Sequence, residues 1–375
     1  MNTNSLEKFA QAARIKLIGI VRSKLDYVLS SDSAELREKR QQLDELKKAL
    51  AQKGKEELIE EVSYTWFNRF IALRFMDANG YTDIKAVSPL PGHTQPEILQ
   101  VFKGGHCPQD LPVDKDKLFR ILDGSIPARD PQNEVYRFLL LGVCNSWNKK
   151  MPFMFQKLYD YTELLMPDDL LSEHSILAEI KENISDDDCK DVEIIGWMYQ
   201  FYVSERHDAI IKAKKKIAPE DIPAATELFT PHWIVRYILE NTLGRFWMLN
   251  NPDSRLQSGM DYYIRSFEEE KEILEIKGPE EISVCDPACG SGHMLTYAFD
   301  LLTKIYEEEG YDRPEIAKLI LQKNLYGMEI DLRAAALAAF ALTMKARDYD
   351  RRFFRNGTIQ PNIICLEKII FDQQE

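Results

Sequence analysis

The feature that most constrains the fold is an alternation of short apolar runs and longer helical stretches in the last third of the chain. The apolar runs have the length and composition of strands and cover residues 282–285, 325–330 and 362–366. Helical spacing marks the stretches around them, which are residues 294–309, 313–322 and 332–345. This order predicts a parallel sheet with right-handed crossovers. Because sheets commonly have about five or more strands, we interpret this part as the beginning of a doubly wound α/β domain.

The remainder of the chain is predicted to be helical. We therefore expect an α plus α/β fold, with a mostly α-helical domain over residues 1–210 and the start of a Rossmann-like domain over residues 211–375. The stretch 58–76 is apolar and aromatic at helical spacing, which is typical of a buried helix. Core packing is the expected role of its large aromatic side chains, Trp66, Phe67, Phe70 and Phe75.

Charge and cysteine usage limit the classes of function. The formal net charge is −13, which is not the profile of a chain whose main task is to grip nucleic acid. Six cysteines are scattered through the sequence, and the only close pair, Cys285 and Cys289, lacks partners for a zinc site. We expect no metal, a reduced cytoplasmic setting and no membrane, since the longest apolar run (334–344) is far shorter than the roughly 20 residues of a membrane span.

A glycine loop follows the first predicted strand, in the segment SVCDPACGSGHML at residues 283–295. A phosphate-binding Walker loop needs a lysine after its last glycine, but His293 follows Gly292. A dinucleotide fingerprint needs a third glycine, and Leu295 stands in that position. Both nucleotide readings are therefore disfavoured.

S-adenosylmethionine fits this loop better. Gly290 and Gly292 lack Cβ atoms and allow close approach of the backbone to a ligand. Asp286 ends the first strand and can meet the ammonium group, and Glu329 ends the second strand and can accept both ribose hydroxyls. The alternative is structural, with the glycines forming only a tight turn and Glu329 and Asp331 only capping the next helix. The order of all these features favours the cofactor reading.

Three segments resemble the motifs of amino-methyltransferases that modify adenine in DNA. DPACGSGHML resembles their first motif, GMEID their second, and ELFTPHWIVRYILENTLG (residues 227–244) the motif that precedes the glycine loop in the γ arrangement. Read from its residues alone, the last segment is a helix capped by Thr230 with Pro231 at its first position. That helix is expected to bury Ile234, Ile238 and Leu239.

The helical front half is similar to the PglX (BrxX) family of adenine-specific methyltransferases in BREX phage-defence systems. The resemblance rests on ELIEEVSYTWFNRFIALRFMDANGY and EIIGWMYQFYVSERHDAI. It implies transfer of a methyl group from S-adenosyl-L-methionine to adenine N6 in double-stranded DNA. Other BREX proteins are the implied partners. A phage-encoded inhibitor is a partner only in the alternative in which the helical half is an interaction module. The implied cofactor-binding residues are Leu228, Phe229, Thr230, Pro231, Asp286, Pro287, Ala288, Gly290, Ser291, Gly292, Glu329 and Ile330.

The sequence departs from that family at the catalytic motif, near the third strand, where the familiar Gly-Asp is not found, and in the target-recognition region, which is also not found. The catalytic motif, Asn/Asp-Pro-Pro-Tyr/Phe, is not found, and the nearest string is Asn251-Pro252-Asp253 ahead of the glycine loop. Near the third strand, Leu366 and Glu367 are candidates to approach the adenine ring. We therefore assign no catalytic residue and expect an N-terminal piece of a longer enzyme that is inactive on its own.

A second class of function is a docking module within a defence complex, in which the cofactor site regulates assembly. A highly charged helix over residues 33–57 motivates this alternative, and its narrow apolar stripe consists of Leu36, Leu43, Leu46 and Leu50. Basic runs at 212–216 and 347–355 could contact DNA phosphates, although solvated helix ends explain them more simply. We expect weak, salt-sensitive DNA binding at most.

Overall fold

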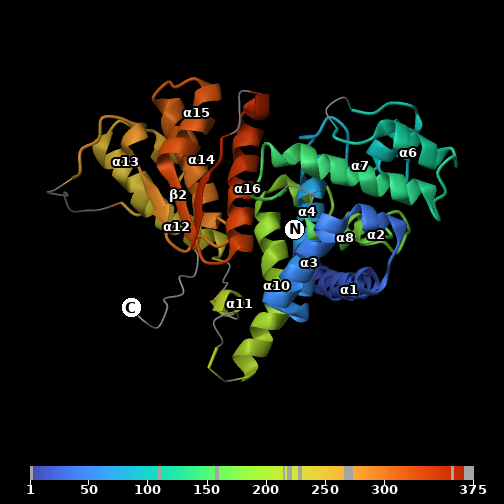
Figure 1. Cartoon of the computed structure of the whole chain (residues 1–375). Helices are drawn as coiled ribbons and strands as arrows, with labels where there is room; N and C mark the ends of the chain where they lie inside the picture. The colour runs from blue at the N-terminus through green and yellow to red at the C-terminus, as the bar shows by residue number, and fades with distance from the viewer. Residues whose placement is uncertain are drawn as a thin grey trace. The chain divides into compact units, whose positions relative to one another are not determined.

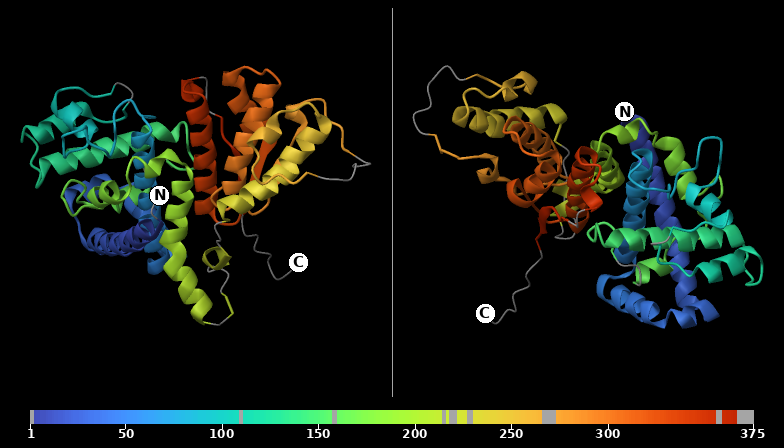
Figure 2. Two further views of the ribbon diagram at one scale, coloured as in Figure 1. Left: turned by 180° about the vertical axis from the view of Figure 1, so that it is seen from behind. Right: turned by 90° about the horizontal axis from the view of Figure 1, so that it is seen from above.

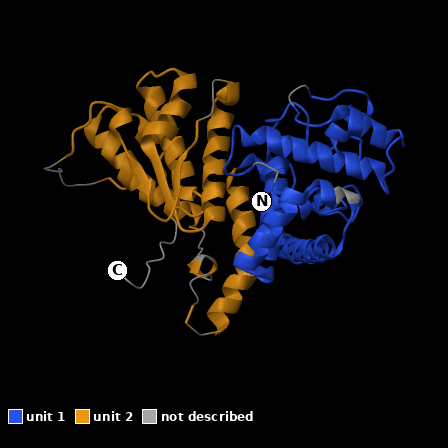
Figure 3. Ribbon diagram, in the orientation of Figure 1, with its two compact units in different colours: residues 1–191 blue, residues 192–375 orange. Residues whose placement is uncertain are grey.

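The computed structural model describes residues 3–108, 111–156, 160–213, 216–217, 222–226, 230–265, 273–355 and 359–366. The chain forms two compact units, residues 1–191 and 192–375 (Figure 3). Each unit is described by itself below, with the elements labelled as in Figure 1. In the described part of the chain, every helix is too short or too polar to cross a membrane.

The regular elements of unit 1, among the residues that the structure describes, are helices joined by loops. Its helices are α1 (Thr3–Ser30), α2 (Ala34–Glu38), α3 (Arg40–Lys53), α4 (Lys55–Ala78), α5 (Glu97–Lys103), α6 (Lys115–Leu122), α7 (Pro131–Asn148), α8 (Tyr161–Leu164), α9 (Ile176–Asn183) and the 3₁₀ turn η1 (Asp188–Lys190). The charged segment predicted as one helix over residues 33–57 is therefore divided. Gly54, with φ of +81°, separates α3 from α4, because a left-handed residue ends a helix.

Helix α4 is the centre of unit 1. Its apolar side chains lie all round the helix rather than along one stripe, and helices α1, α3 and α9 pack against it. A helix that is apolar on all sides is stable only when it is surrounded. The predicted core aromatics are confirmed, since Trp66, Phe67, Phe70 and Phe75 are all buried.

Unit 2 combines helices with a small parallel sheet. Its helical elements are α10 (Glu193–Ala213), α11 (Ile222–Thr226), α12 (His232–Leu239), the π-helical turn η3 (Glu240–Gly244), α13 (Arg245–Asn250), η4 (Leu256–Gly259), η5 (Pro279–Glu281), α14 (His293–Glu308), α15 (Arg313–Leu319), the π-helical turn η6 (Ile320–Asn324), α16 (Leu332–Tyr349) and η7 (Phe353–Arg355). Its strands are β1 (Val284–Asp286), β2 (Leu325–Glu329) and β3 (Asn362–Cys365).

The predicted alternation of strands and helices is confirmed. Among the described residues the strands pair in parallel in the order β1-β2-β3, with Asp286 beside Gly327 and Glu329 beside Cys365. The carboxyl ends of β1 and β2 therefore meet at one edge of the sheet, where open α/β sheets bind ligands. What the structure supports is a three-stranded parallel sheet in a mostly helical chain, and the Rossmann-like assignment stays an interpretation.

One face of the sheet is covered by two long helices. Helix α14 contacts β1 and β2, α16 contacts β2 and β3, and the two helices contact each other (Figures 1 and 2). Gly327 faces this layer, because a Cβ there would lie 2.9 Å from a Leu295 methyl group. On the opposite face, Met328 is 37% exposed and Ile364 is 54% exposed. The side chains thus alternate between the helix layer and the open face.

Helix α10 belongs to unit 2, the same compact unit as the sheet. The predicted division between residues 210 and 211 places this helix in the helical part of the chain, whereas unit 2 begins at Val192. The cause is packing, since α10 contacts α16 and α11. This grouping brings residues of α10 to the glycine loop, as the next section describes.

We predict that Gly292→Ala destabilises unit 2 more than Gly310→Ala does. Both glycines have positive φ, +91° and +78°, so both substitutions carry backbone strain of about 1–2 kcal/mol. Only at Gly292 would the new Cβ also lie 3.0 Å from Ala338, whereas nothing stands within 4 Å at Gly310. Overpacking of that kind adds about 1–3 kcal/mol.

The measurement is urea denaturation read by hydrogen exchange in peptides of α14, which reports on unit 2 alone. Equal losses of stability in the two variants would contradict the close packing of the loop against α16.

Candidate cofactor-binding site

The glycine loop connects β1 to α14 and is fastened to β2. Gly290 and Gly292 both have positive φ, +53° and +91°, which permits the sharp turn. The Cys289 amide donates to the Met328 carbonyl at 2.9 Å, and the Gly292 amide donates to the Cys289 carbonyl at 2.8 Å. The first bond ties the loop to the neighbouring strand, so the loop has a defined position at the carboxyl edge of the sheet.

Glu329 ends β2 and holds this edge together. Its Oε2 accepts from the Gly290 amide at 2.8 Å, and its Oε1 accepts from the amides of Ile330 at 2.7 Å and Asp331 at 3.0 Å. The residue is only 7% exposed. Three backbone donors compensate the burial of the carboxylate. The carboxylate therefore connects the glycine loop to the start of α16.

Asp286 ends β1 on the other side of the loop. Its Oδ1 accepts from the Ala288 amide at 3.2 Å. Burial raises the pKa of this carboxyl group above the ordinary value, the Ala288 bond partly offsets that, and the charge of Glu329 raises the pKa further. Two carboxylates in one partly buried site attract a positive group, because such a group favours the ionised form of Asp286.

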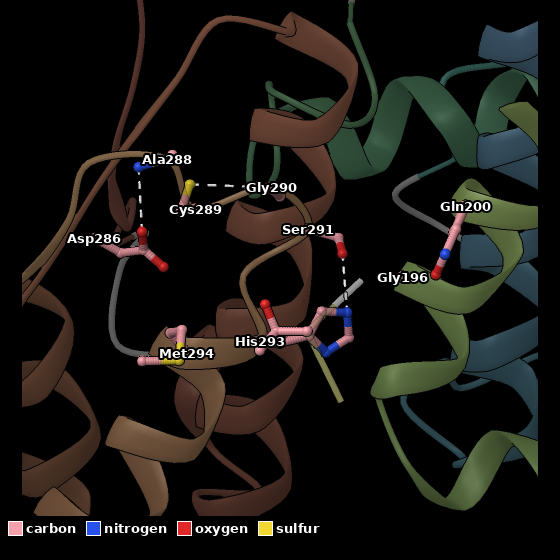
Figure 4. A pocket seen from close by; sticks show the side chains of 10 residues that line it. Gly196, Gln200, Asp286, Ala288, Cys289, Gly290, Ser291, His293 and Met294 are labelled. Carbon is pink, nitrogen blue, oxygen red and sulfur yellow. Dashed lines mark hydrogen bonds between the residues drawn. The ribbon is translucent and has the colours of Figure 1, made fainter. Parts of the chain in front are cut away.

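A pocket opens between the loop and α10. It is lined by Gly196, Gln200, Thr230, Asp286, Ala288, Cys289, Gly290, Ser291, His293 and Met294 (Figure 4). Its volume is about 50 Å³, which suits a small polar group rather than a whole cofactor. None of these described lining residues is lysine or arginine, so the pocket lacks the cations with which phosphate sites are commonly built.

His293 begins α14 beneath the loop. Its Nε2 lies 3.0 Å from the Ser291 hydroxyl. Burial, with a smaller contribution from the charge of His232, lowers the pKa of His293 to about 3. The imidazole is therefore neutral at physiological pH, and it contributes shape and hydrogen bonding to the pocket rather than positive charge.

Helix α10 is held against the loop at two points. A Cβ on Gly196 would lie 2.4 Å from His293 Nε2 and 2.6 Å from Ser291 Oγ, so only glycine permits this approach. One turn later, the Tyr199 hydroxyl donates to Asp331 Oδ2 at 2.6 Å. Asp331 also binds the Arg333 guanidinium, and these bonds lower the pKa of its carboxyl group against the opposing effect of burial.

Five of the residues proposed from sequence line the pocket together, namely Thr230, Asp286, Ala288, Gly290 and Ser291. Glu329 lies beside them through its bond to Gly290. Gly292 is buried, and Ala338 takes the space beside its Cα that was expected to face a ligand. The exposed residues Pro231, Pro287 and Ile330 are not part of the pocket lining, and Leu228 and Phe229 lie outside the described residues.

The prediction for the helix that follows Thr230 was wrong in two details. Helix α12 begins at His232, and Pro231 rather than Thr230 occupies the capping position, with no side-chain cap. Ile238 was expected to be buried but is 39% exposed, and Val235 is buried with Leu239. The apolar face is therefore displaced from the expected one. The buried Val235 and Leu239 are four residues apart, so the helical spacing is regular and only the choice of the buried face was wrong.

Several other sequence candidates lie away from the site or cannot be placed. Leu366 is exposed, and Glu367, Lys214 and Lys215 lie outside the described residues. Lys212 pairs with Asp208 on its own helix. This pairing agrees with the interpretation of that basic run as a solvated helix end. Asp331 caps α16 by accepting a hydrogen bond from the Arg333 amide. The helix cap that the structural alternative predicted is therefore present next to the candidate cofactor pocket.

Sequence reasoning missed the contribution of α10. Gly196 and Gln200 line the pocket, yet they belong to a stretch that reads as an ordinary core helix. No local pattern indicates a partner about 90 residues further along the chain. His293 and Met294, also part of the lining, follow the glycines directly and could have been included from their position alone.

Comparisons with known proteins agree with this geometry. Residues 267–369, which contain β1, β2 and β3, match the family described as MmeI, DNA-methyltransferase domain. The chain is 39% identical, over its whole length, to "Adenine-specific methyltransferase BrxX" of Escherichia coli O9:H4 (strain HS). It is also 39% identical, over 82% of its length, to "Adenine-specific methyltransferase PglX" of Lacticaseibacillus casei (strain Zhang).

The sheet, the glycine loop and the family match thus define the C-terminal part of the chain as a methyltransferase-type domain. The chain as a whole is a homologue of the BrxX and PglX adenine-specific methyltransferases. It spans 33% of the length of the first relative and 27% of the second. Within the described residues, no three metal-ligating side chains form a cluster.

We predict that the stability of unit 2 falls as the pH drops below about 6.5 and that His293 causes part of this fall. The unfolded chain binds a proton near pH 6.5, whereas folded His293 binds one only near pH 3. Stability is therefore fully present above the unfolded pKa and decreases by up to about 1.4 kcal/mol per pH unit below it. His293→Gln removes this contribution.

The measurement compares urea midpoints, read by hydrogen exchange in α14, at pH 7 and pH 5. The exposed His106 supplies the control, since His106→Gln should keep the full pH dependence. A His293→Gln variant with an unchanged pH dependence would rule out the buried neutral imidazole.

Proposed function

We propose that this chain carries the S-adenosyl-L-methionine-binding part of a DNA N6-adenine methyltransferase. The observation that carries the proposal is the pocket at the carboxyl edge of the sheet, where the glycine loop brings Asp286 and Gly290 beside Glu329. Homology to adenine-specific methyltransferases supports the choice of reaction. Following the family resemblance, we place the complete enzyme in BREX anti-phage defence, with double-stranded DNA and other BREX proteins as partners.

The charge of the site suits this cofactor. S-adenosylmethionine carries a positive sulfonium and an ammonium group, and it has no phosphate. The described lining contains the Asp286 carboxylate and the polar side chains of Gln200 and Thr230, with no lysine or arginine. A cation is favoured at such a site, whereas the phosphates of a nucleotide would be repelled by Asp286 and Glu329.

The Glu329 carboxylate can accept a hydrogen bond from the ribose of the same cofactor. The backbone amides that it already binds limit how many ribose hydroxyls it can accept. A carboxylate offers about four lone-pair positions, and three backbone amides already occupy three of them. One ribose hydroxyl can be accepted without disturbing the loop. Accepting both hydroxyls, as the sequence suggested, requires one backbone bond to be released.

The chemistry follows from these roles. When bound, the cofactor supplies the methyl group for the adenine amino nitrogen. Asp286 holds the positive amino-acid end, Glu329 orients the ribose, and the loop keeps both carboxylates in place through the Gly290 amide. The target adenine has to leave the duplex to reach such a pocket. The curated relatives are about three times as long as this chain, and we assign the catalytic motif to regions that they contain beyond the aligned part.

The docking alternative draws no support from helix α3. The apolar stripe that motivated it is used inside unit 1, because α3 packs against α4 and α8. Leu46 is fully buried, and Leu43 and Leu50 are half-buried. The charged residues of α3 are then an ordinary solvated face.

We predict that the chain binds S-adenosylmethionine and that Glu329→Gln weakens binding at least about tenfold, a loss of about 1.4 kcal/mol. The amide keeps the size of the side chain but loses the charge and one acceptor oxygen, so it cannot hold Gly290, Ile330, Asp331 and a ribose hydroxyl together. Isothermal titration calorimetry gives both affinities.

Glu309→Gln is the matched control, since Glu309 is exposed beyond the end of α14. Its affinity should equal that of the unsubstituted chain. If the unsubstituted chain shows no binding, or if Glu329→Gln binds as tightly as it does, the proposed role of this site is refuted.

We also predict that cofactor affinity decreases as the pH falls through the raised pKa of Asp286. The ionised carboxylate attracts the ammonium group, and protonation abolishes that attraction. Because burial raises this pKa above 3.8, the decrease begins at a higher pH than it would for an exposed aspartate. Asp286→Asn is expected to bind more weakly at pH 7 and to lose the dependence. Titrations at several pH values, with the exposed Asp253→Asn as control, decide whether the dependence belongs to Asp286.

A further inference from the structure

A buried ionic group lies at the end of helix α12. Glu240, the first residue of the π-helical turn η3, is 0% exposed. Its Oε1 accepts from the Tyr297 hydroxyl at 2.6 Å and from Arg236 Nε at 3.1 Å, and its Oε2 accepts from the Tyr262 amide at 2.5 Å. A buried carboxylate destabilises a fold unless such partners compensate its charge. Because each bond is needed for that purpose, the three partners are held in one arrangement around Glu240.

Tyr297 connects this ionic group to helix α14. Its hydroxyl donates to Glu240 and accepts from Arg236 Nε at 3.2 Å. The Arg236 guanidinium also lies 5.6 Å from the centre of the tyrosine ring. Burial and the bond to Glu240 raise the pKa of Tyr297 to about 12. The hydroxyl therefore keeps, at physiological pH, the proton that it donates to the carboxylate.

The same tyrosine contacts the beginning of α12. The Tyr297 ring packs edge-on against the ring of His232, the first residue of that helix, with the ring centres 6.1 Å apart. Thr230, which lines the pocket, precedes His232 by two positions. The Pro231 carbonyl between them accepts hydrogen bonds from two amides of the first turn of α12. Thr230 is thus attached directly to a helix whose two ends contact Tyr297 and its partners.

Tyr297 is also close to the pocket along its own helix. It lies one turn after His293, which begins α14 and lines the pocket together with Thr230. The apolar face of α12, Val235 and Leu239, joins the core that α14 borders. Apolar burial is non-directional, whereas a satisfied buried polar network specifies one geometry. The bonds of Tyr297 therefore determine how the segment with Thr230 is placed relative to the start of α14.

We propose that Tyr297 is a positioning residue of the cofactor site. Through its bonds to Glu240 and Arg236, the hydroxyl places Thr230 for contact with S-adenosylmethionine. This inference rests on the proposed function. It adds to that function a residue that does not itself line the pocket, and it names Thr230 as the side chain through which the effect reaches the cofactor.

The test is a double-mutant cycle, with affinities for S-adenosylmethionine measured by calorimetry. Tyr297→Phe removes the hydroxyl and keeps the ring, and it should weaken binding at least about fivefold. Thr230→Ala removes the side chain that is positioned, and it should weaken binding by at least about the same factor. In the double variant the tyrosine substitution should add less than about twofold, because its effect passes through Thr230. A general loss of structure would instead lower the affinity equally in both backgrounds.

Tyr349→Phe is the matched control. The Tyr349 hydroxyl donates to Glu307 at 2.8 Å, and the Arg313 guanidinium lies over its ring. The substitution therefore removes a similar bridge at the other end of α14, and it should leave the affinity within about twofold. Hydrogen exchange in peptides of α14 reports whether each variant is folded. If Tyr297→Phe is not folded, Glu240→Gln takes its place in the cycle with the same expected results.

The outcomes separate this inference from the proposed function. A loss of affinity in Tyr297→Phe that disappears in the Thr230→Ala background supports the positioning role. The role is overturned if Tyr297→Phe binds as tightly as the unsubstituted chain, if its loss is equal in both backgrounds, or if Thr230→Ala leaves binding unchanged. Absence of binding to the unsubstituted chain refutes the proposed function itself, and the inference falls with it.

Discussion

The site depends on one buried carboxylate. The Glu329 carboxylate accepts hydrogen bonds from the amides of Gly290, Ile330 and Asp331. These bonds join the glycine loop after β1 to the turn that starts α16. Parallel strands bring these segments to one edge, but strand pairing alone does not fix the conformation of a loop. A carboxylate with three backbone donors does so, because each bond to a charged acceptor is strong and an unmade one would be costly. The carboxylate that orders the loop is thus the same one that we propose orients the ribose.

The electrostatic character of the pocket follows from what surrounds that carboxylate. Asp286 is partly buried, and this burial raises the pKa of its carboxyl group. The charge of Glu329 raises that pKa further. His293 could have offset this negative charge, but burial keeps its imidazole neutral. The described lining adds no lysine or arginine. The result is a site in which a positive ligand relieves repulsion between two carboxylates, and this is a physical reason for preferring a sulfonium and ammonium cofactor to a nucleotide.

Local sequence patterns were sufficient to predict the strands of the sheet. They were insufficient to predict the residues of α10 that line the pocket. The strands, α14 and α16 follow from short apolar runs, helical spacing and the glycines between them, all of which act within a few residues. Gly196 gains its importance only from its approach to His293 and Ser291, and Gln200 only from lining the same pocket. Nothing in the sequence of residues 193–213 distinguishes this stretch from a core helix. The exposure of Ile238 was mispredicted for a related reason, because tertiary packing and not local spacing decides which face of α12 is buried.

Helix α10 shows how a helix outside a binding motif can enter a site. Its approach is permitted by the absence of a side chain at Gly196 and is held by the bond from Tyr199 to Asp331, a residue that also caps α16. Asp331 in turn donates its amide to Glu329. A continuous set of short bonds therefore runs from α10 to the carboxylate that orders the loop.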